Sequence, residues 1–161
     1  MSADWTGPIH GSYWVRPGKL LAGPYPVAWK ADITRQNFER LWSAGINYFV
    51  DLTEPDECEP YLGVLWDGAE YHRLSIPDFD TPHPDHLRDI LDVIDAALLM
   101  ARTVYVHCLG GIGRTGTVIG CYLVRHGMPG PEAVKTVTRW RGVTSPETEA
   151  QRQMIQNWRE E

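Results

Sequence analysis

Cysteine is scarce in this sequence, and no two cysteines lie close together along the chain. Three of the 161 residues are cysteines, Cys58, Cys108 and Cys121, and none belongs to a C-x-x-C pair. An odd and sparse count does not fit a small secreted protein held by disulfides, and no His/Cys set has the spacing of a zinc site. We therefore expect a reduced, cytoplasmic compartment in which a reactive thiol survives, and no structural metal.

Long apolar runs and an excess of positive charge are lacking as well. The longest apolar stretch, residues 96–101, is far too short to span a bilayer, and the first residues have no basic or apolar region of a signal peptide. The formal net charge of −6 argues against nucleic acid or an anionic membrane as a partner, because both attract basic surfaces. We expect neither kind of partner, and we expect a monomer.

Internal repeats, low-complexity tracts and Gly/Ser linkers are also missing, which predicts one domain over residues 1–161. Periodicity and turn residues predict strands at 19–23, 46–52, 70–76 and 103–107, and helices at 34–44, 85–100, 113–125 and 131–139. A last helix is expected to begin near Thr144, with Thr144 and Glu147 as a capping box. Strands alternating with helices predict an α/β fold whose central, mostly parallel sheet is flanked by helices on both faces.

What the sequence does contain is a glycine-rich loop, residues 107–116, at the carboxyl end of the expected strand 103–107. Gly110, Gly111 and Gly113 permit positive φ and a close approach of the backbone to a ligand, so successive N–H groups can form an anion-binding nest. The positive N-terminal end of the next helix adds to this field. Arg114, six residues after Cys108, can hold two phosphate oxygens with its planar guanidinium. The loop therefore predicts a phosphate-binding site.

The same loop predicts a nucleophile in Cys108. A thiol at a helix N-terminus beside an arginine is largely a thiolate near neutral pH, and the thiolate is the reactive form. The Thr115 hydroxyl is expected to hydrogen-bond the sulfur and make it a better leaving group in a second step. These residues predict phosphoryl transfer through a phosphocysteine intermediate, with no metal and no cofactor.

The string H-C-L-G-G-I-G-R-T-G at residues 107–116 resembles the H-C-x5-R-[ST] signature of the protein tyrosine phosphatase superfamily. Residues 20–26 are similar to the opening strand of its small dual-specificity-like members, so the resemblance extends from about Trp14 to Trp158. It implies a cysteine-phosphatase fold in which His107 supports the loop and the thiolate. It also implies that the phosphate is bound by Leu109, Gly110, Gly111, Ile112, Gly113 and Arg114.

A second segment, I-P-D-F-D-T-P at residues 76–82, resembles the W-P-D-F-G-x-P loop that carries the general acid of this superfamily. The resemblance implies that Asp78 protonates the leaving oxygen and that the same aspartate activates the water of the second step. Two positions depart from the pattern, because Ile76 replaces the tryptophan and Asp80 replaces the glycine. A second carboxylate two residues away leaves Asp80 open as an alternative acid.

Two further segments resemble supporting parts of the superfamily site. Residues 147–151 are similar to Q-T-x-x-Q, with glutamate in place of the first glutamine, and this implies that Gln151 positions the water of the second step. An ordinary glutamine on a helix surface is the alternative. Residues 52–55 occupy the place of a loop that supports the arginine, which implies that Glu54 pairs with Arg114.

The substrate is predicted from the lining of the loop. Superfamily members that act on inositol phosphates tend to carry lysines there, whereas the variable positions here are the uncharged Leu109, Gly110 and Ile112. This favours a protein-tyrosine phosphatase acting on phosphorylated proteins or peptides, with phosphoserine and phosphothreonine as further substrates and an aromatic near Phe79 lining the slot. The alternatives are a pseudophosphatase module that binds phosphate without hydrolysis, and a phosphatase of non-protein substrates such as inositol phosphates.

The two remaining cysteines allow a redox role. An oxidised Cys108 can be trapped as a disulfide by a resolving thiol. Cys121 is expected on an apolar helix as a buried small side chain, and Cys58 lies in an acidic stretch. The sequence leaves open whether either one reaches Cys108.

Overall fold

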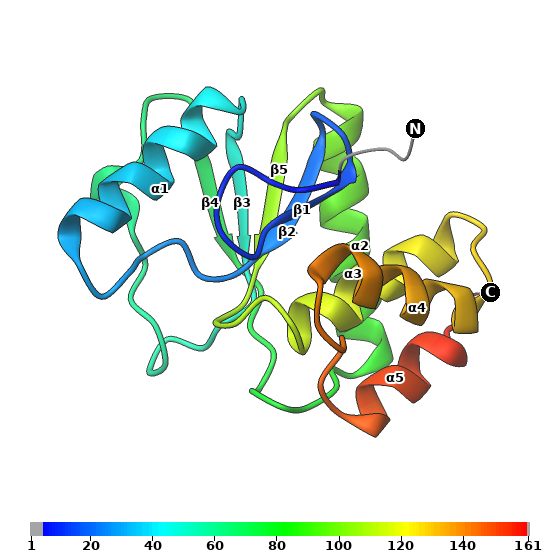
Figure 1. Ribbon diagram of the computed structural model, residues 1–161. Helices are drawn as coiled ribbons and strands as arrows, with labels where there is room; N and C mark the ends of the chain where they lie inside the picture. The colour runs from blue at the N-terminus through cyan, green and yellow to red at the C-terminus, as the bar shows by residue number, and fades with distance from the viewer. Residues whose placement is uncertain (1–4, 161) are drawn as a thin grey trace.

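The computed structural model describes residues 5–160, which form one α/β unit (Figure 1). The strands are β1 (Tyr13–Arg16), β2 (Leu20–Gly23), β3 (Tyr48–Asp51), β4 (Glu70–Arg73) and β5 (Val104–His107). The helices are α1 (Ala31–Ser43), the short 3-10 helix η1 (Leu62–Val64), α2 (Pro84–Leu99), α3 (Arg114–Arg125), α4 (Gly130–Arg141) and α5 (Glu149–Gln156).

The five strands form one sheet in the order β1-β2-β5-β3-β4. Strands β2, β5, β3 and β4 run parallel, and β1 is antiparallel to β2 at one edge. All four residues of the central strand β5 are buried, as expected for a β-branched and apolar strand covered on both faces. The predicted mostly parallel sheet is confirmed.

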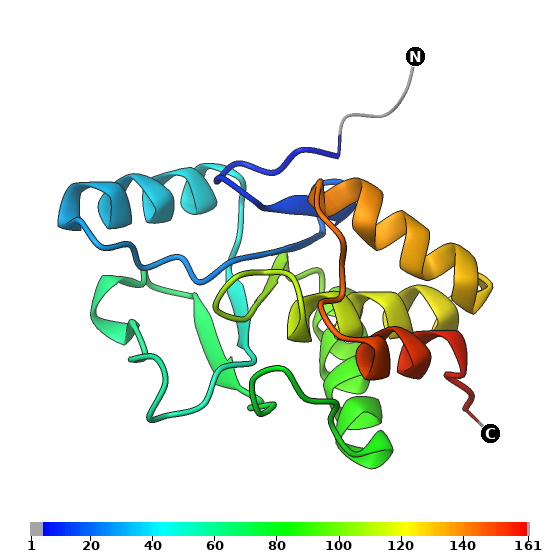
Figure 2. The same cartoon turned by 60° about the horizontal axis from the view of Figure 1, so that its bottom comes forward.

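Helices cover both faces of the sheet, also as predicted. On β5, Val104 and Val106 pack into the larger core with α2, α3, α4 and α5, whereas Tyr105 points to the opposite face and packs with residues of α1. Figures 1 and 2 show the same division, with α1 alone on its side. Among residues 5–160, no helix is long and apolar enough to cross a membrane.

The last helix begins later than predicted. Helix α5 starts at Glu149, and its capping box pairs Thr148 with Gln151 rather than Thr144 with Glu147. The segment before α5 is instead held by tertiary contacts, because Ser145 Oγ donates to the Ile112 carbonyl at 2.6 Å and Ser145 N donates to Thr138 Oγ1 at 3.0 Å. Strand β1 was not predicted, and β3 and β4 are shorter than their expected ranges of 46–52 and 70–76.

The sheet places the glycine-rich loop at the carboxyl ends of three neighbouring strands. His107 at the end of β5 lies in register with Gly23 of β2 and Asp51 of β3. Gly111 has a φ of +73°, and a Cβ built on it would lie 2.5 Å from the Gly23 carbonyl carbon. Only glycine fits this close crossing, so the loop 108–113 is pinned beside the end of β2.

Candidate active site

The loop between β5 and α3 holds Cys108 at its base. The side chain is buried, with 2% exposed, and its Sγ accepts a hydrogen bond from the Gly111 N–H at 3.3 Å. Gly113 is the N-cap of α3 and supplies no side-chain cap to the first turn. The sulfur therefore sits near the N-terminus of α3, where the helix dipole is positive.

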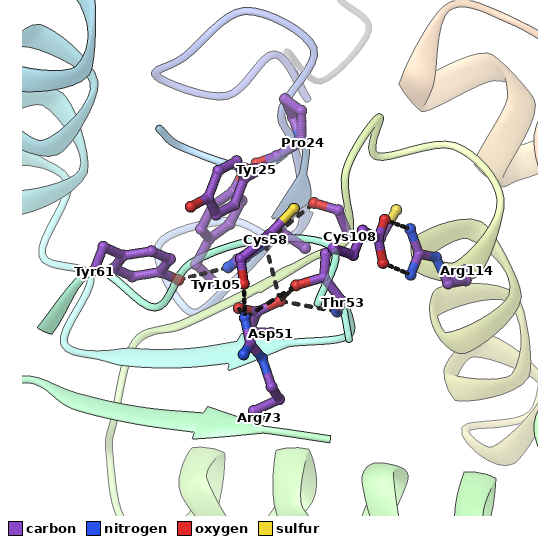
Figure 3. Close-up of polar contacts among 12 residues, drawn as sticks. Pro24, Tyr25, Asp51, Thr53, Cys58, Tyr61, Arg73, Tyr105, Cys108 and Arg114 are labelled. Carbon is purple, nitrogen blue, oxygen red and sulfur yellow. Dashed lines mark hydrogen bonds and ion pairs between the residues drawn. The ribbon is translucent and has the colours of Figure 1, made fainter. Parts of the chain in front are cut away.

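Arg114 opens α3, and its buried guanidinium is held by Glu57. Nη1 and Nη2 donate to the two Glu57 carboxylate oxygens at 2.7 and 2.6 Å (Figure 3). Nη1 also donates to the Ile76 carbonyl at 3.0 Å. The bonds from Arg114 hold the pKa of Glu57 below its usual range. This bidentate pair aims the guanidinium at the phosphate loop before any ligand is present.

The prediction that Glu54 pairs with Arg114 is wrong. Glu54 and Glu57 occupy the two ends of a turn, in which the Glu57 N–H donates to the Glu54 carbonyl at 3.0 Å. The turn carries the later residue to the loop, and Glu57 Oε1 also accepts from the Glu54 N–H at 3.2 Å. The acidic run 54–59 was the only signal in the sequence, and it did not identify which glutamate faces the arginine.

Asp78 reaches the phosphate loop, and Asp80 does not. Asp78 Oδ1 lies 3.2 Å from Arg114 Nη2, and Phe79 next to it has a φ of +61° that turns the chain sharply. Asp80 is exposed, and its Oδ1 accepts from the Thr81 N–H at 2.8 Å within its own turn. The geometry favours Asp78 as the acid over the alternative left open by the sequence.

Gln151 lies near the loop, and its amide makes two hydrogen bonds within the protein. The buried side chain accepts from the Thr148 N–H at 3.0 Å and donates to the Asp80 carbonyl at 3.2 Å. Glu147 lies closer to the loop, since its Oε1 is only 2.6 Å from a Cβ built on Gly113. The two hydrogen bonds of Gln151 fix the orientation of its amide, and its role in positioning water stays a prediction. The Glu147 carboxylate, which stands in place of the first glutamine of the motif, also lies beside the loop.

Thr115 also differs from its expectation. Its Oγ1 is buried and has no hydrogen-bond partner within residues 5–160, so the bond expected to Cys108 Sγ is not formed in this structure. A buried hydroxyl without a partner carries a free-energy cost, which a bond to the sulfur would relieve.

His107 is buried beneath the loop and connects it to the sheet. Its Nε2 lies 2.5 Å from the Tyr61 hydroxyl, and its Nδ1 lies 3.2 Å from the Cys108 carbonyl. Burial lowers the pKa of His107, although Asp51, 3.9 Å away, acts in the opposite direction. His107 thus supports the loop, as the resemblance implied, and Tyr61 is a partner that the sequence did not reveal.

Asp51 is the buried acceptor at the centre of this region. It accepts bonds from Thr53 Oγ1 at 2.6 Å and Arg73 Nη2 at 3.2 Å (Figure 3). It also accepts a bond from the Tyr71 hydroxyl at 2.5 Å. Burial acts to raise the pKa of Asp51, but His107 and the bonds from Thr53 and Tyr71 outweigh it and hold the pKa below its usual range. We call His107, Tyr61, Asp51, Thr53, Tyr71 and Arg73 the floor network.

The three cysteines are all free and buried. Burial raises the pKa of the Cys58 thiol and of the Cys121 thiol, so both are held in the unreactive protonated form. A disulfide with Cys108 stays an untested prediction. Within residues 5–160, no group of three or more His, Cys, Asp or Glu side chains is arranged to hold a metal ion.

Comparison with known families finds a match over the catalytic segment. Residues 25–128 match the model of a family described as "Polymorphic toxin system, DSP-PTPase phosphatase". The chain is 32% identical over 111 residues to the putative tyrosine phosphatase 067L of Invertebrate iridescent virus 3, covering 65% of this chain and 42% of that protein. It is 34% identical over 110 residues to the phosphatidylglycerophosphate phosphatase PTPMT2 of Arabidopsis thaliana, covering 66% and 45%. The chain thus matches less than half of the length of these relatives.

Solved structures share the fold. The crystal structure of Tk-PTP in the active form superposes with a TM-score of 0.72 at 27% identity, covering 85% of this chain and 88% of that chain. The core catalytic domain of the PP-IP phosphatase SIW14 from S. cerevisiae superposes with a TM-score of 0.74, covering 96% of this chain and 88% of that chain. At 16% identity, this likeness shows the fold alone.

Proposed function

The chain belongs to the DSP-PTPase family of cysteine-based phosphatases, and from that premise we propose that it removes phosphate from phosphotyrosine in proteins or peptides. Phosphoserine and phosphothreonine are proposed as secondary substrates. We also propose that it acts as a cytoplasmic monomer without a cofactor. The observation that carries the choice of substrate is the mouth of the site, where Leu109 of the phosphate loop and Phe79 of the acid loop are 50% and 61% exposed.

These two side chains suit an aryl phosphate better than a polyphosphate. Apolar side chains beside the loop can contact an aromatic ring while the phosphate enters the nest of N–H groups. Residues 107–113 contain no lysine or arginine that would bind further phosphates. The named activity of the relative PTPMT2 keeps a lipid phosphate as a competing substrate.

In the first proposed step, the Cys108 thiolate attacks phosphorus and the bond to the leaving oxygen breaks. Asp78 gives its proton to that oxygen, which leaves as the tyrosine phenol. Arg114 and the loop N–H groups bind the equatorial oxygens, where charge is greatest in the transition state. Glu57 contributes by holding the guanidinium in the orientation that this requires.

In the second proposed step, water attacks the phosphocysteine. The new P–O bond forms, the P–S bond breaks, and the electron pair returns to the Cys108 sulfur as thiolate. Inorganic phosphate is the product. Thr115 Oγ1, buried and without a partner among the described residues, can donate to the departing sulfur.

The experiment that tests the proposal compares kcat/KM for a phosphotyrosine peptide, the same peptide with phosphoserine, an inositol phosphate and phosphatidylglycerophosphate, all in the presence of EDTA. We expect the phosphotyrosine peptide to be favoured by about tenfold or more over each of the others. The Cys108→Ser variant should have no turnover yet still bind vanadate. A higher kcat/KM for the inositol phosphate or the lipid would overturn the substrate assignment, and no turnover by the wild-type protein would mean a pseudophosphatase.

A further inference from the structure

The second step needs a group that accepts a proton from water, and the amide of Gln151 is not a base. An amide holds a water through a free oxygen or a free N–H. Gln151 is buried, its oxygen accepts from the Thr148 N–H, and its nitrogen donates to the Asp80 carbonyl. These bonds form the capping box of α5 and tie that helix to the acid loop. Gln151 therefore helps to hold α5 and the acid loop in place beside the site.

Glu147 is placed where Gln151 was expected to act. Its carboxylate lies against Gly113, the N-cap of α3 at the end of the phosphate loop. The residue is exposed, and within residues 5–160 its carboxylate takes part in no hydrogen bond and no ion pair. Both oxygens are thus free to accept from water at the mouth of the site.

The backbone around Glu147 is fixed to the catalytic loop. Ser145 Oγ donates to the Ile112 carbonyl at 2.6 Å, and a Cβ built on Gly116 would lie 2.3 Å from that same Oγ. The Arg152 guanidinium donates to the Pro146 carbonyl at 2.9 Å from the other side. Figure 2 shows this segment descending beside the start of α3. Glu147 is therefore carried on a segment whose position relative to Cys108 is set by direct bonds.

A glycine at position 113 leaves room for this carboxylate. Any side chain there would meet Glu147 Oε1 at 2.6 Å and the Gln151 amide at 3.2 Å. Asp78, the other carboxylate at the mouth, is ion-paired with Arg114 at 3.2 Å. Of the two, Glu147 is the one without a cation at its oxygens.

We propose that Glu147 is the general base of the second step. The water oxygen bonds to phosphorus, one water proton passes to a Glu147 oxygen, and the P–S bond breaks with its electron pair returning to Cys108. The products are monohydrogen phosphate, a thiolate and a protonated Glu147, which then releases its proton to solvent. The inference rests on the proposed phosphocysteine route and adds a catalytic residue to it.

The test is rapid-mixing kinetics with p-nitrophenyl phosphate, whose good leaving group makes the first step fast. The variants are Glu147→Gln, with the same size and no basic oxygen pair, and Glu149→Gln as a matched control. Glu149 is exposed on the same segment and is bound to Arg152 at 3.1 Å, away from the loop. Asp78→Asn is the third variant, because it removes the competing base.

We expect Glu147→Gln to release p-nitrophenolate in a burst and then turn over at least about tenfold more slowly, as loss of a general base requires. The Cys108 peptide should carry a phosphoryl group when the reaction is quenched. Glu149→Gln should match the wild type, and Asp78→Asn should show no accumulation of phosphocysteine.

If Glu147→Gln hydrolyses the phosphocysteine at the wild-type rate, the proposed role of Glu147 is overturned. The same holds if phosphocysteine accumulates in Asp78→Asn and not in Glu147→Gln. Both results would leave the proposed function unchanged, because they concern only which residue accepts the proton from water. Turnover by Cys108→Ser would instead remove the phosphocysteine route, and with it both proposals.

Discussion

The two sides of the phosphate loop are built in opposite ways. Beneath it, the floor network is buried, and its side chains bond to one another, with Asp51 accepting from three neighbours and His107 held between Tyr61 and the Cys108 carbonyl. Above it, at the rim, Asp78 and Glu147 are partly or fully exposed and make few contacts. The polar groups of the floor network bond mainly to one another. At the rim, Glu147 keeps its carboxylate oxygens free for water, and Asp78 is ion-paired with Arg114.

This contrast separates stability from chemistry. Groups whose hydrogen bonds are made mostly inside the protein fix the shape of the loop, and removing them costs folding free energy. Groups with free oxygens at the mouth exchange protons during the reaction, and removing them costs rate. Substitutions on the two sides should therefore be distinguishable by measuring both quantities for each.

The largest effect is expected at the rim, from Asp78→Asn. With phenyl phosphate, a poor leaving group, kcat should fall by about 10² to 10⁴, because the departing oxygen loses its proton donor. With p-nitrophenyl phosphate the fall should be much smaller. The midpoint of thermal unfolding should not change, since the Asp78 carboxylate is exposed at the loop surface.

Asp80→Asn is the matched control, because its carboxylate bonds only within its own turn. A fall in kcat with phenyl phosphate in this variant, and not in Asp78→Asn, would assign the acid to Asp80.

Glu57→Gln should affect both quantities, because Glu57 joins the two sides through Arg114. Loss of one oxygen of the bidentate pair should lower kcat/KM by about ten- to a hundredfold through misplacement of the guanidinium. The free energy of unfolding should fall by about 1–3 kcal/mol. Kinetics with p-nitrophenyl phosphate measure the first effect, and urea unfolding measures the second. The control variant Glu54→Gln should change neither kcat/KM nor the free energy of unfolding. Equal losses in Glu54→Gln would indicate that Glu54 pairs with Arg114, as expected from the sequence.

Asp51→Asn should act on stability in a pH-dependent way. The folded-state pKa of Asp51 lies below the unfolded value of about 3.9, so its stabilisation is complete above about pH 5 and is lost as the pH falls through the folded-state pKa. The variant should therefore be less stable than the wild type at neutral pH, and the gap should narrow in acid. Urea unfolding from pH 7 to pH 3 checks this, and a gap that is constant with pH would contradict it.

Tyr61→Phe should give the smallest effect. It removes one hydrogen bond to His107 and keeps the ring contacts with Phe38 and Phe49, so about 1 kcal/mol of stability should be lost. Urea unfolding measures that loss, and kcat should change less than for any rim variant. A large loss of kcat with unchanged stability would mean that the floor takes part in the chemistry, and the contrast between the two sides would fail.

The sequence predicted the parts of the site that local patterns encode. The strand, glycine loop and helix around Cys108 and Arg114 follow one another along the chain, so their chemistry could be predicted without a structure. The alternation of strands and helices was enough for the sheet and its layers. Strand β1 was missed because Tyr13–Arg16 is short and lies beside a glycine turn with weak alternation.

The partners of these groups could not be predicted because they depend on distant contacts. Glu57 rather than Glu54 faces Arg114 because a turn rotates the chain between them. Tyr61 and Asp51 meet His107 across 46 and 56 residues, a separation at which spacing carries no information. Gln151 fitted a pattern, but the sequence did not reveal that its side chain also forms the capping box of α5.

The account is tested most directly by stopping the reaction of the wild-type protein with an aryl phosphate in acid and measuring the mass of the peptide that contains Cys108. The account predicts one added phosphoryl group on that cysteine during turnover, and none in Cys108→Ser. Turnover without a phosphorylated Cys108, or a phosphoryl group on any other residue, would contradict it.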